Sequence, residues 1–153
     1  MRRLLIVALL PLLAAACVAT TEPTEVALGG NEWVLASLGG APPVPRSRLT
    51  LQFESQTAGG YGGCNWYGGD YRVGTRRSLR FDQFSSTARG CLSPPGVEDQ
   101  ERDYLDALGR VEHYRVIANR LVLLDQSNTP LLEFTRREPL PMNEQDLIGT
   151  SWS

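Results

Sequence analysis

Cysteine side chains are the groups in this sequence best suited to chemistry, and Cys17 stands in the most informative setting. An uncharged apolar run from Leu4 to Ala16 precedes it, and two arginines precede that run. Such a run is too short to span a bilayer, which takes about 20 residues, but it is typical of a signal-peptide core. The small residues before Cys17 resemble a bacterial lipobox. The sequence therefore predicts a signal peptide over residues 1–16 and acylation of Cys17.

The lipobox is imperfect, because Ala14 stands where leucine is more usual. The alternative is ordinary cleavage after Ala16 or Ala19, which would release a soluble periplasmic protein. If Cys17 is acylated, residues 17–27 form a lipidated tether, because they are poor in bulky apolar side chains. Valine rather than aspartate follows Cys17, so retention at the inner membrane is not indicated. In a Gram-negative cell, the prediction is an outer-membrane lipoprotein that faces the periplasm.

The other two cysteines, Cys64 and Cys91, are left as an even pair once Cys17 is acylated. An unpaired thiol is a liability in an oxidising compartment, so we expect a disulfide between them. The chain-entropy model gives this constraint about 3.5 kcal/mol of stability. The alternative is a two-cysteine metal site, but the only imidazole is that of His113 and no CxxC spacing exists. We expect no metal and no cofactor.

Catalytic groups are sparse in the sequence. His113 lies in a strand-like stretch, and no nucleophile motif such as G-x-S-x-G accompanies it. The run GGYGGCNWYGG lacks the lysine of a phosphate-binding loop and does not open a helix. One predicted helix carries five acids that we interpret as its solvated face and favourable first-turn charge: Glu98, Asp99, Glu101, Asp103 and Asp106. We expect no enzyme activity.

Residues 58–71 combine six glycines with four large aromatic side chains. The aromatic side chains could line a barrel mouth or present a binding face: Tyr61, Trp66, Tyr67 and Tyr71. The alternative is that some belong to the core and the rest pack over the disulfide loop. Asn65, next to Cys64, is expected to cap its own turn through side-chain hydrogen bonds.

Alternation of apolar and polar residues predicts a mainly β fold. Leu49, Leu51 and Phe53 face one way in the clearest strand, and a helix over 97–111 follows a Pro-Pro-Gly sequence. We expect strands in residues 31–38, 48–54, 78–84, 112–118, 120–125 and 130–135, with two more in 58–71 around a turn at 62–65. These lengths and turns indicate antiparallel hairpins, consistent with a small barrel and one helix.

The C-terminal residues contain a second copy of an earlier spacing. The motif L-x-G-x-x-W occurs from Leu28 and again from Leu147. We interpret residues 138–153 as a linker followed by the start of a truncated second repeat. A coincidental tail is the alternative, because three matching residues are weak evidence.

The charge of the chain argues against nucleic acid as a partner. Its net charge is -2, and removal of a leader that holds two arginines and no acid changes this to -4. A mildly acidic domain lacks the basic face that phosphate binding requires.

The order of motifs over residues 30–135 resembles the META domain, or HslJ-like, family. The matching stretches include W-V-L-x-S-L, G-x-G-G-C-N-x-Y-x-G-x-Y, S-T-A-R-G-C and L-x-L-L-D. Arg89 and Gly90 depart from the pattern, since the family often has methionines there. The resemblance implies that residues 28–137 form a small antiparallel β-barrel of roughly lipocalin-like topology with a helix over one end. It also implies an envelope lipoprotein linked to stress or antibiotic tolerance, without a defined molecular activity.

Two functions follow as expectations. The first is a non-enzymatic envelope lipoprotein that contacts the membrane through its anchor and acts through other envelope proteins. The second is a lipocalin-like module that binds a small apolar ligand inside the barrel. The second requires that Leu51, Phe53, Leu123 and their neighbours leave a cavity.

Overall fold

The computed structural model describes residues 28–137. The predicted signal peptide, the tether with Cys17 and the proposed repeat in 138–153 lie outside the described residues. Within the described range, no helix is both long enough and apolar enough to cross a membrane.

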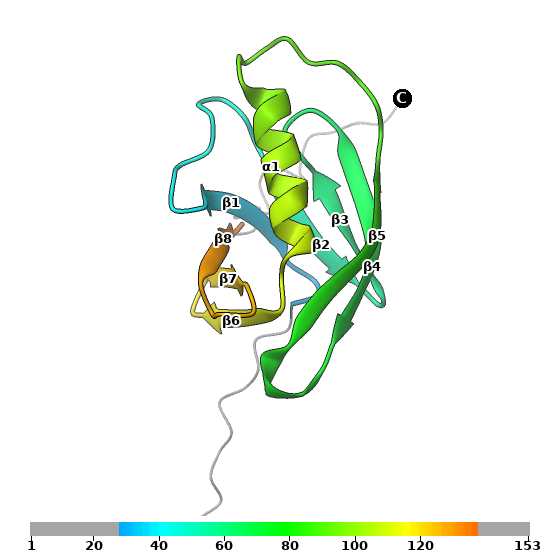
Figure 1. The fold of residues 1–153 in the computed structure, drawn as a ribbon, viewed down its shortest axis with the longest axis vertical. Helices are drawn as coiled ribbons and strands as arrows, with labels where there is room; N and C mark the ends of the chain where they lie inside the picture. The colour runs from blue at the N-terminus through cyan, green and yellow to red at the C-terminus, as the bar shows by residue number, and fades with distance from the viewer. Residues whose placement is uncertain (1–27, 138–153) are drawn as a thin grey trace, which may run out of the picture.

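A single curved sheet of eight antiparallel strands makes up most of the domain (Figure 1). Its spatial order is β5-β4-β3-β2-β1-β8-β7-β6, so the first strand lies in the middle and pairs with both the second and the last. The strands are β1 Glu32–Leu38, β2 Thr50–Glu54, β3 Thr57–Tyr61, β4 Trp66–Val73, β5 Leu79–Ser86, β6 His113–Ile117, β7 Arg120–Leu124 and β8 Pro130–Arg136.

Apolar and polar side chains alternate along the strands because one face of the sheet is buried and the other is exposed to solvent. In β2, Leu51 and Phe53 are at most 2% exposed, whereas Gln52 between them faces solvent. The strand register places buried side chains of neighbouring strands opposite each other. Trp33 of β1 lies opposite Leu51 of β2, and both are 0% exposed. The inward-facing side chains form one continuous apolar core.

The two edge strands approach each other without forming a ladder. β5 and β6 meet near their ends, through a bridge between Ser78 and His113 and the Leu79 N–H donating to the Glu112 carbonyl, 3.0 Å away. The side chain of Glu112 also pairs with Arg80 of β5. The sheet is therefore a curled half-barrel that stays open along most of this seam. The predicted mainly β, antiparallel architecture with one helix is confirmed.

The α-helix α1, Val97–Gly109, crosses in front of the curved sheet (Figure 1). It begins after Gly96, whose φ of +84° suits glycine, and ends at Gly109, two residues before the end of the predicted range. Its buried face contains Val97, Gln100, Glu101, Tyr104, Ala107 and Leu108. Between β4 and β5 the chain also makes a short 3-10 helix, η1 Thr75–Arg77, that the sequence did not predict.

One expectation about the acids of α1 is wrong. Glu101 is not on the solvated face, since it is only 6% exposed. Leu105 is partly buried and packs against the core. The other four acids, Glu98, Asp99, Asp103 and Asp106, are exposed as predicted.

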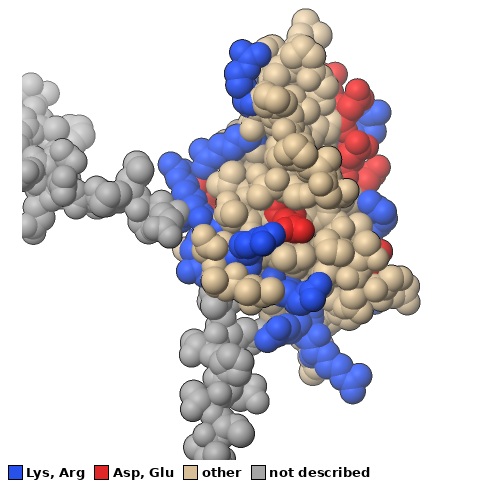
Figure 2. All heavy atoms as spheres, turned by 90° about the vertical axis from the view of Figure 1, so that its left-hand side faces the viewer, with Lys and Arg blue, Asp and Glu red and all other residues tan. Residues whose placement is uncertain are grey.

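Charged side chains of both signs are scattered among uncharged ones on the side of the domain that Figure 2 faces. Arginine side chains are spread over this side, and acidic side chains gather mainly at its right-hand edge (Figure 2). Several arginines are held by acids on neighbouring strands, including Arg120 of β7 by Glu133 of β8.

Candidate functional site

The disulfide stands at the turn between β3 and β4. Cys64 and Cys91 are bonded, with their Cα atoms 5.8 Å apart, so the bridge ties this turn to the loop before α1. The turn itself is closed by the Gly62 N–H donating to the Asn65 carbonyl, 2.7 Å away. Both features agree with the sequence-based expectation for this segment.

Asn65 does not cap its own turn, contrary to the prediction. Its side-chain oxygen accepts hydrogen bonds from Thr87 Oγ1 and from the Arg89 N–H, at 2.9 and 2.7 Å. Its Nδ2 donates to the Arg89 carbonyl and to Glu101 Oε2, at 3.1 and 2.9 Å. The amide therefore joins three segments that are distant in sequence.

The buried carboxylate of Glu101 completes this junction. It accepts from the Asn65 main-chain N–H at Oε1, 2.9 Å away, as well as from Nδ2 at Oε2. A buried carboxylate is tolerated only when its oxygens are hydrogen-bonded, and here both are. The junction of Asn65 and Glu101 thus fixes α1 on the β3–β4 turn, which is a structural role.

A pair of tyrosines occupies the centre of the concave side. The hydroxyl oxygens of Tyr67 and Tyr104 lie 2.6 Å apart, and Tyr67 donates to the Thr50 carbonyl, 2.7 Å away. Burial raises the pKa of both phenols well above the usual value, and negative charge on Tyr67 raises that of Tyr104 further. Neither phenol is an effective general acid or base near neutral pH, so the pair is structural.

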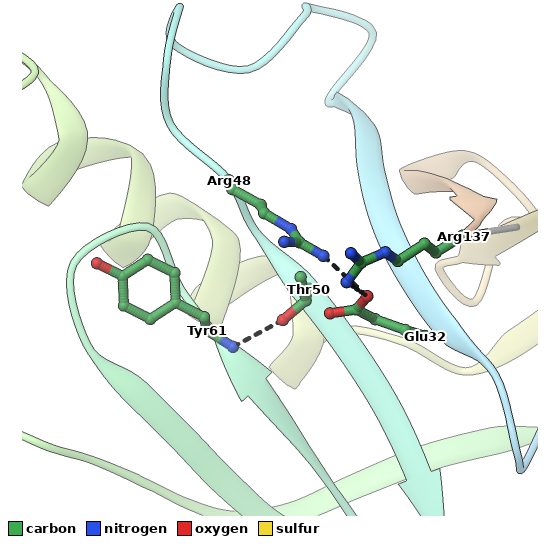
Figure 3. Close-up of polar contacts among 5 residues, drawn as sticks. All are labelled: Glu32, Arg48, Thr50, Tyr61 and Arg137. Atoms are coloured by element: carbon green, nitrogen blue, oxygen red, sulfur yellow. Dashed lines mark hydrogen bonds and ion pairs between the residues drawn. The ribbon is translucent and has the colours of Figure 1, made fainter. Parts of the chain in front are cut away.

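The β2–β3 ladder is interrupted beside this pair. The Tyr61 N–H donates to the hydroxyl of Thr50, 3.0 Å away, as Figure 3 shows. The backbones approach so closely here that a Cβ at position 60 would lie 2.1 Å from the Thr50 carbonyl oxygen, so only glycine fits. The carbonyl of Thr50 is left free to accept from the tyrosines.

The four aromatic residues proposed as one binding face lie on two faces of the sheet. Tyr67 is buried, and Tyr71 packs edge-on against Phe53 of the core, with ring centroids 5.0 Å apart. Tyr61 and Trp66 are cross-strand partners, and their ring centroids are 5.4 Å apart. Trp66 is 66% exposed. The four side chains therefore do not form the single binding face that was predicted. Side chains alternate along β4, so Trp66 and Tyr67 point to opposite faces of the sheet.

A polar cluster lies beside this outer surface, where β1 begins, just before β2 and just after β8. Arg48 and Arg137 converge on one carboxylate oxygen of Glu32, each 2.8 Å away (Figure 3). The two guanidinium groups are about half exposed, so solvent screens the attraction. The sequence did not indicate this cluster, because Arg137 and Glu32 are 105 residues apart.

His113 lies at the end of β6, next to the seam between the two edge strands. The Ser78–His113 bridge places a hydroxyl-bearing residue opposite the imidazole-bearing one. Within residues 28–137, no hydrogen bond joins the side chains of these two residues, and His113 pairs with Leu124 through the backbone. In the same range, no three His, Cys, Asp or Glu side chains are grouped in a way that could hold a metal ion.

The remaining sequence-predicted groups fall in the core. Leu51, Phe53 and Leu123, whose packing decides between a filled and an empty barrel, are at most 2% exposed. The helix adds Tyr104 to the same interior, and Tyr104 is in ring contact with Phe134 of β8, with centroids 6.3 Å apart.

Comparisons with known proteins agree with this architecture. The family model described as the META domain matches residues 26–138. An NMR structure of a protein from Burkholderia xenovorans is 24% identical, with a TM-score of 0.58, and the match covers 73% of this chain and 85% of that one. A second protein solved by NMR is 19% identical, with a TM-score of 0.56 and coverage of 71% and 90%. At these identities the likeness concerns the fold alone. A comparison with curated proteins gave no match.

Proposed function

The chain belongs to the META domain family, and we propose on that premise that it is a non-enzymatic protein of the bacterial cell envelope. Lipid on Cys17 holds it to the membrane, and it acts through contacts made by the outer surface of its half-barrel. Its partners are other components of the envelope.

The observation that carries this proposal is the contrast between interior and exterior. The concave side is filled by its own large side chains, since Trp33, Tyr104 and Phe134 are each 0% exposed. On the outer face, by contrast, Trp66 is 66% exposed and has Tyr61 as its neighbour. Tyr and Trp are enriched at the energetically important centres of protein interfaces, so this adjacent pair on the outer face supports a contact site there.

The absence of a hydrogen bond between the side chains of Ser78 and His113, within the described residues, supports the non-enzymatic part of the proposal. A serine nucleophile is activated by a base within hydrogen-bond reach, and the base in turn needs a group that orients it. Neither contact is present in residues 28–137. The neutral tyrosine pair, Tyr67 and Tyr104, offers no substitute, since burial raises the pKa of both phenols.

Intact mass of the protein extracted from cell membranes tests the anchor. We expect a triacyl adduct on Cys17 and a gain of about two mass units on reduction of the Cys64–Cys91 bridge. A Cys17→Ala variant should leave the membrane fraction. An unmodified chain beginning at Cys17 or Thr20, found in the periplasmic extract, would contradict the anchor.

A deletion strain tests the envelope role. We expect raised sensitivity to detergent or antibiotic that wild-type protein restores and the Cys17→Ala variant does not. Native mass spectrometry of the purified protein addresses the rival function. A co-purifying apolar molecule, released only on unfolding, would favour the ligand-binding module and count against action through the outer surface.

A further inference from the structure

The outer face of β2, β3, β4 and β5 contains an open groove of about 440 Å³. Its floor lacks side chains, because Gly59 of β3 and Gly68 of β4 lie directly opposite each other in the register. Both glycines line the groove, and so does the exposed ring of Trp66.

Two rows of side chains border this floor. On one side lie the cross-strand partners Tyr61 and Trp66. On the other side Glu54, Thr57 and Asp70 form a row across three strands, since Glu54 pairs with Thr57 and Thr57 with Asp70. Trp66 and Asp70 are four residues apart on one strand, which separates the two rows by about 13 Å. One or two six-membered rings fit in that width.

The two carboxylates of this groove differ from their neighbours in being unpaired. Asp82, next in the row, is held by Arg72, and Glu32 on β1 is held by two arginines. Glu54 and Asp70 make no side-chain hydrogen bond or ion pair with any residue in 28–137. Their oxygens are therefore available as strong acceptors.

We propose that this groove binds a saccharide, with one pyranose ring stacked on Trp66 and hydroxyl groups of the neighbouring ring donating to Glu54 and Asp70. The C–H groups on one face of a pyranose carry slight positive charge and match the negative face of an indole ring. Its hydroxyl groups need acceptors beside that ring, and the groove supplies two carboxylates. Neutral polar side chains, Gln52, Thr57 and Ser85, line the rest. The inference rests on the proposed function in that it assigns a ligand class to the same outer surface.

A saccharide fits this combination better than the other ligand classes. An apolar molecule would cover the carboxylates without hydrogen-bonding them, which is costly. A basic peptide would be attracted to Glu54 and Asp70 but would make no use of the three neutral side chains of the lining. The following test separates these cases.

The test follows the indole N–H signals of the ¹⁵N-labelled mature protein during titration with chitotetraose and cellotetraose. We expect the Trp66 signal to shift saturably at sugar concentrations up to about 10 mM. The Trp33 signal is an internal control that should not move, because that ring is 0% exposed and its Nε1 donates to the Leu28 carbonyl. The chain also contains Trp152, so the spectra of Trp66→Ala and Trp152→Ala together assign the three indole signals.

Three variants and a matched control locate the contact. Trp66→Ala, followed through the backbone amide signals of Gly59 and Gly68 because its indole is absent, should weaken binding about tenfold. The double variant Glu54→Gln/Asp70→Asn should weaken it by a similar factor. Gly68→Val should block the floor, since a Cβ there meets only the Ala58 carbonyl oxygen at 3.8 Å and the strand can hold it. Ile117→Ala removes a similarly exposed apolar side chain from β6, 62% exposed, and should bind as wild type does.

Two results would overturn the proposal. One is a Trp66 signal that neither sugar moves, or that moves equally in the Glu54→Gln/Asp70→Asn variant. The other is tighter binding of tetralysine that is lost in high salt, which would make the ligand cationic. Neither result bears on the acyl adduct or the deletion phenotype, so failure here is distinct from failure of the proposed function.

Discussion

Tyr104 of α1 directs its hydroxyl both at the Thr50 carbonyl of β2, 3.4 Å away, and at the hydroxyl of Tyr67, which lies closer to that carbonyl. Tyr67 uses its own proton for that carbonyl, at 2.7 Å, so Tyr104 is the donor in the 2.6 Å contact between the two hydroxyls. This chain of two hydrogen bonds attaches the helix to the centre of the sheet. It depends on both phenols keeping their protons.

The first prediction is that the domain loses stability at alkaline pH. The pKa values of Tyr67 and Tyr104 are raised in the folded state, chiefly by burial. Their contribution is therefore complete below the unfolded-state pKa of about 10 and is lost as pH rises above it. The slope is about 1.4 kcal/mol per pH unit for each tyrosine that ionises only on unfolding.

Urea unfolding between neutral pH and pH values above about 10 measures this slope. The Tyr67→Phe/Tyr104→Phe variant is expected to be less stable near neutrality, because the Thr50 carbonyl loses its donors, but to decline less steeply in alkali. If the free energy of unfolding falls equally steeply with pH in the wild type and in the variant, groups other than these two tyrosines cause the loss of stability in alkali.

The second prediction concerns Glu101. Glu101→Ala leaves the Asn65 N–H and Nδ2 without their buried acceptor and should cost about 3 kcal/mol of unfolding free energy. Glu101→Gln should cost less, because the amide keeps one acceptor oxygen. Asp103→Ala, an exposed acid on the same helix, should change stability by no more than about 0.5 kcal/mol. Equal losses of stability in Glu101→Ala and Asp103→Ala would contradict the buried hydrogen-bonded junction of Glu101 with Asn65.

The third prediction is that the disulfide stabilises mainly through the unfolded chain. Its cysteines are 27 residues apart, so replacing both by alanine should cost about 3.5 kcal/mol. The folded variant should give the same amide NMR spectrum as the wild type away from positions 64 and 91, because Asn65 and Glu101 still hold the turn. Denaturation of the wild type in reducing agent should give the same loss. A much larger loss would mean that the bridge also positions the Cys91 loop.

The fourth prediction is that the ion pairs of Glu32 with Arg48 and Arg137 contribute little to the free energy of unfolding. Both arginines that contact Glu32 are about half exposed, so Glu32→Gln should cost less than about 1 kcal/mol. The difference should disappear in about 1 M salt, where the Debye length is about 3 Å. A larger, salt-insensitive effect would indicate that the Arg137 N–H bond to the Glu32 carbonyl had been broken as well.

Local patterns were sufficient to predict the eight strands and α1, but not the short helix η1. Alternation at Leu49, Leu51 and Phe53 located β2, and the Pro-Pro-Gly sequence located the start of α1. The sheet order was not predictable in the same way, because β1 pairs with β8 across about a hundred residues of chain. No local signal encodes that pairing.

The candidate groove was partly predictable. Counting outward from the predicted turn at 62–65 gives Tyr61 opposite Trp66 and then Gly59 opposite Gly68. Because side chains alternate along a strand, the same count places the outer aromatic pair on the face opposite to Tyr67. The burial of Glu101 was not predictable, since its partner Asn65 is 36 residues earlier and a helical carboxylate is usually solvated.

The central place of β1 sets the order in which the domain can be completed. Residues 32–38 are made first among the strands, yet one side of β1 has no partner until residues 130–136 exist. An unpaired strand edge invites contact with other chains, and pairing over such a sequence separation is slow. A nascent chain of this kind therefore carries an open edge through nearly its whole synthesis, and a holding chaperone or unfolded transit would protect it until β8 arrives.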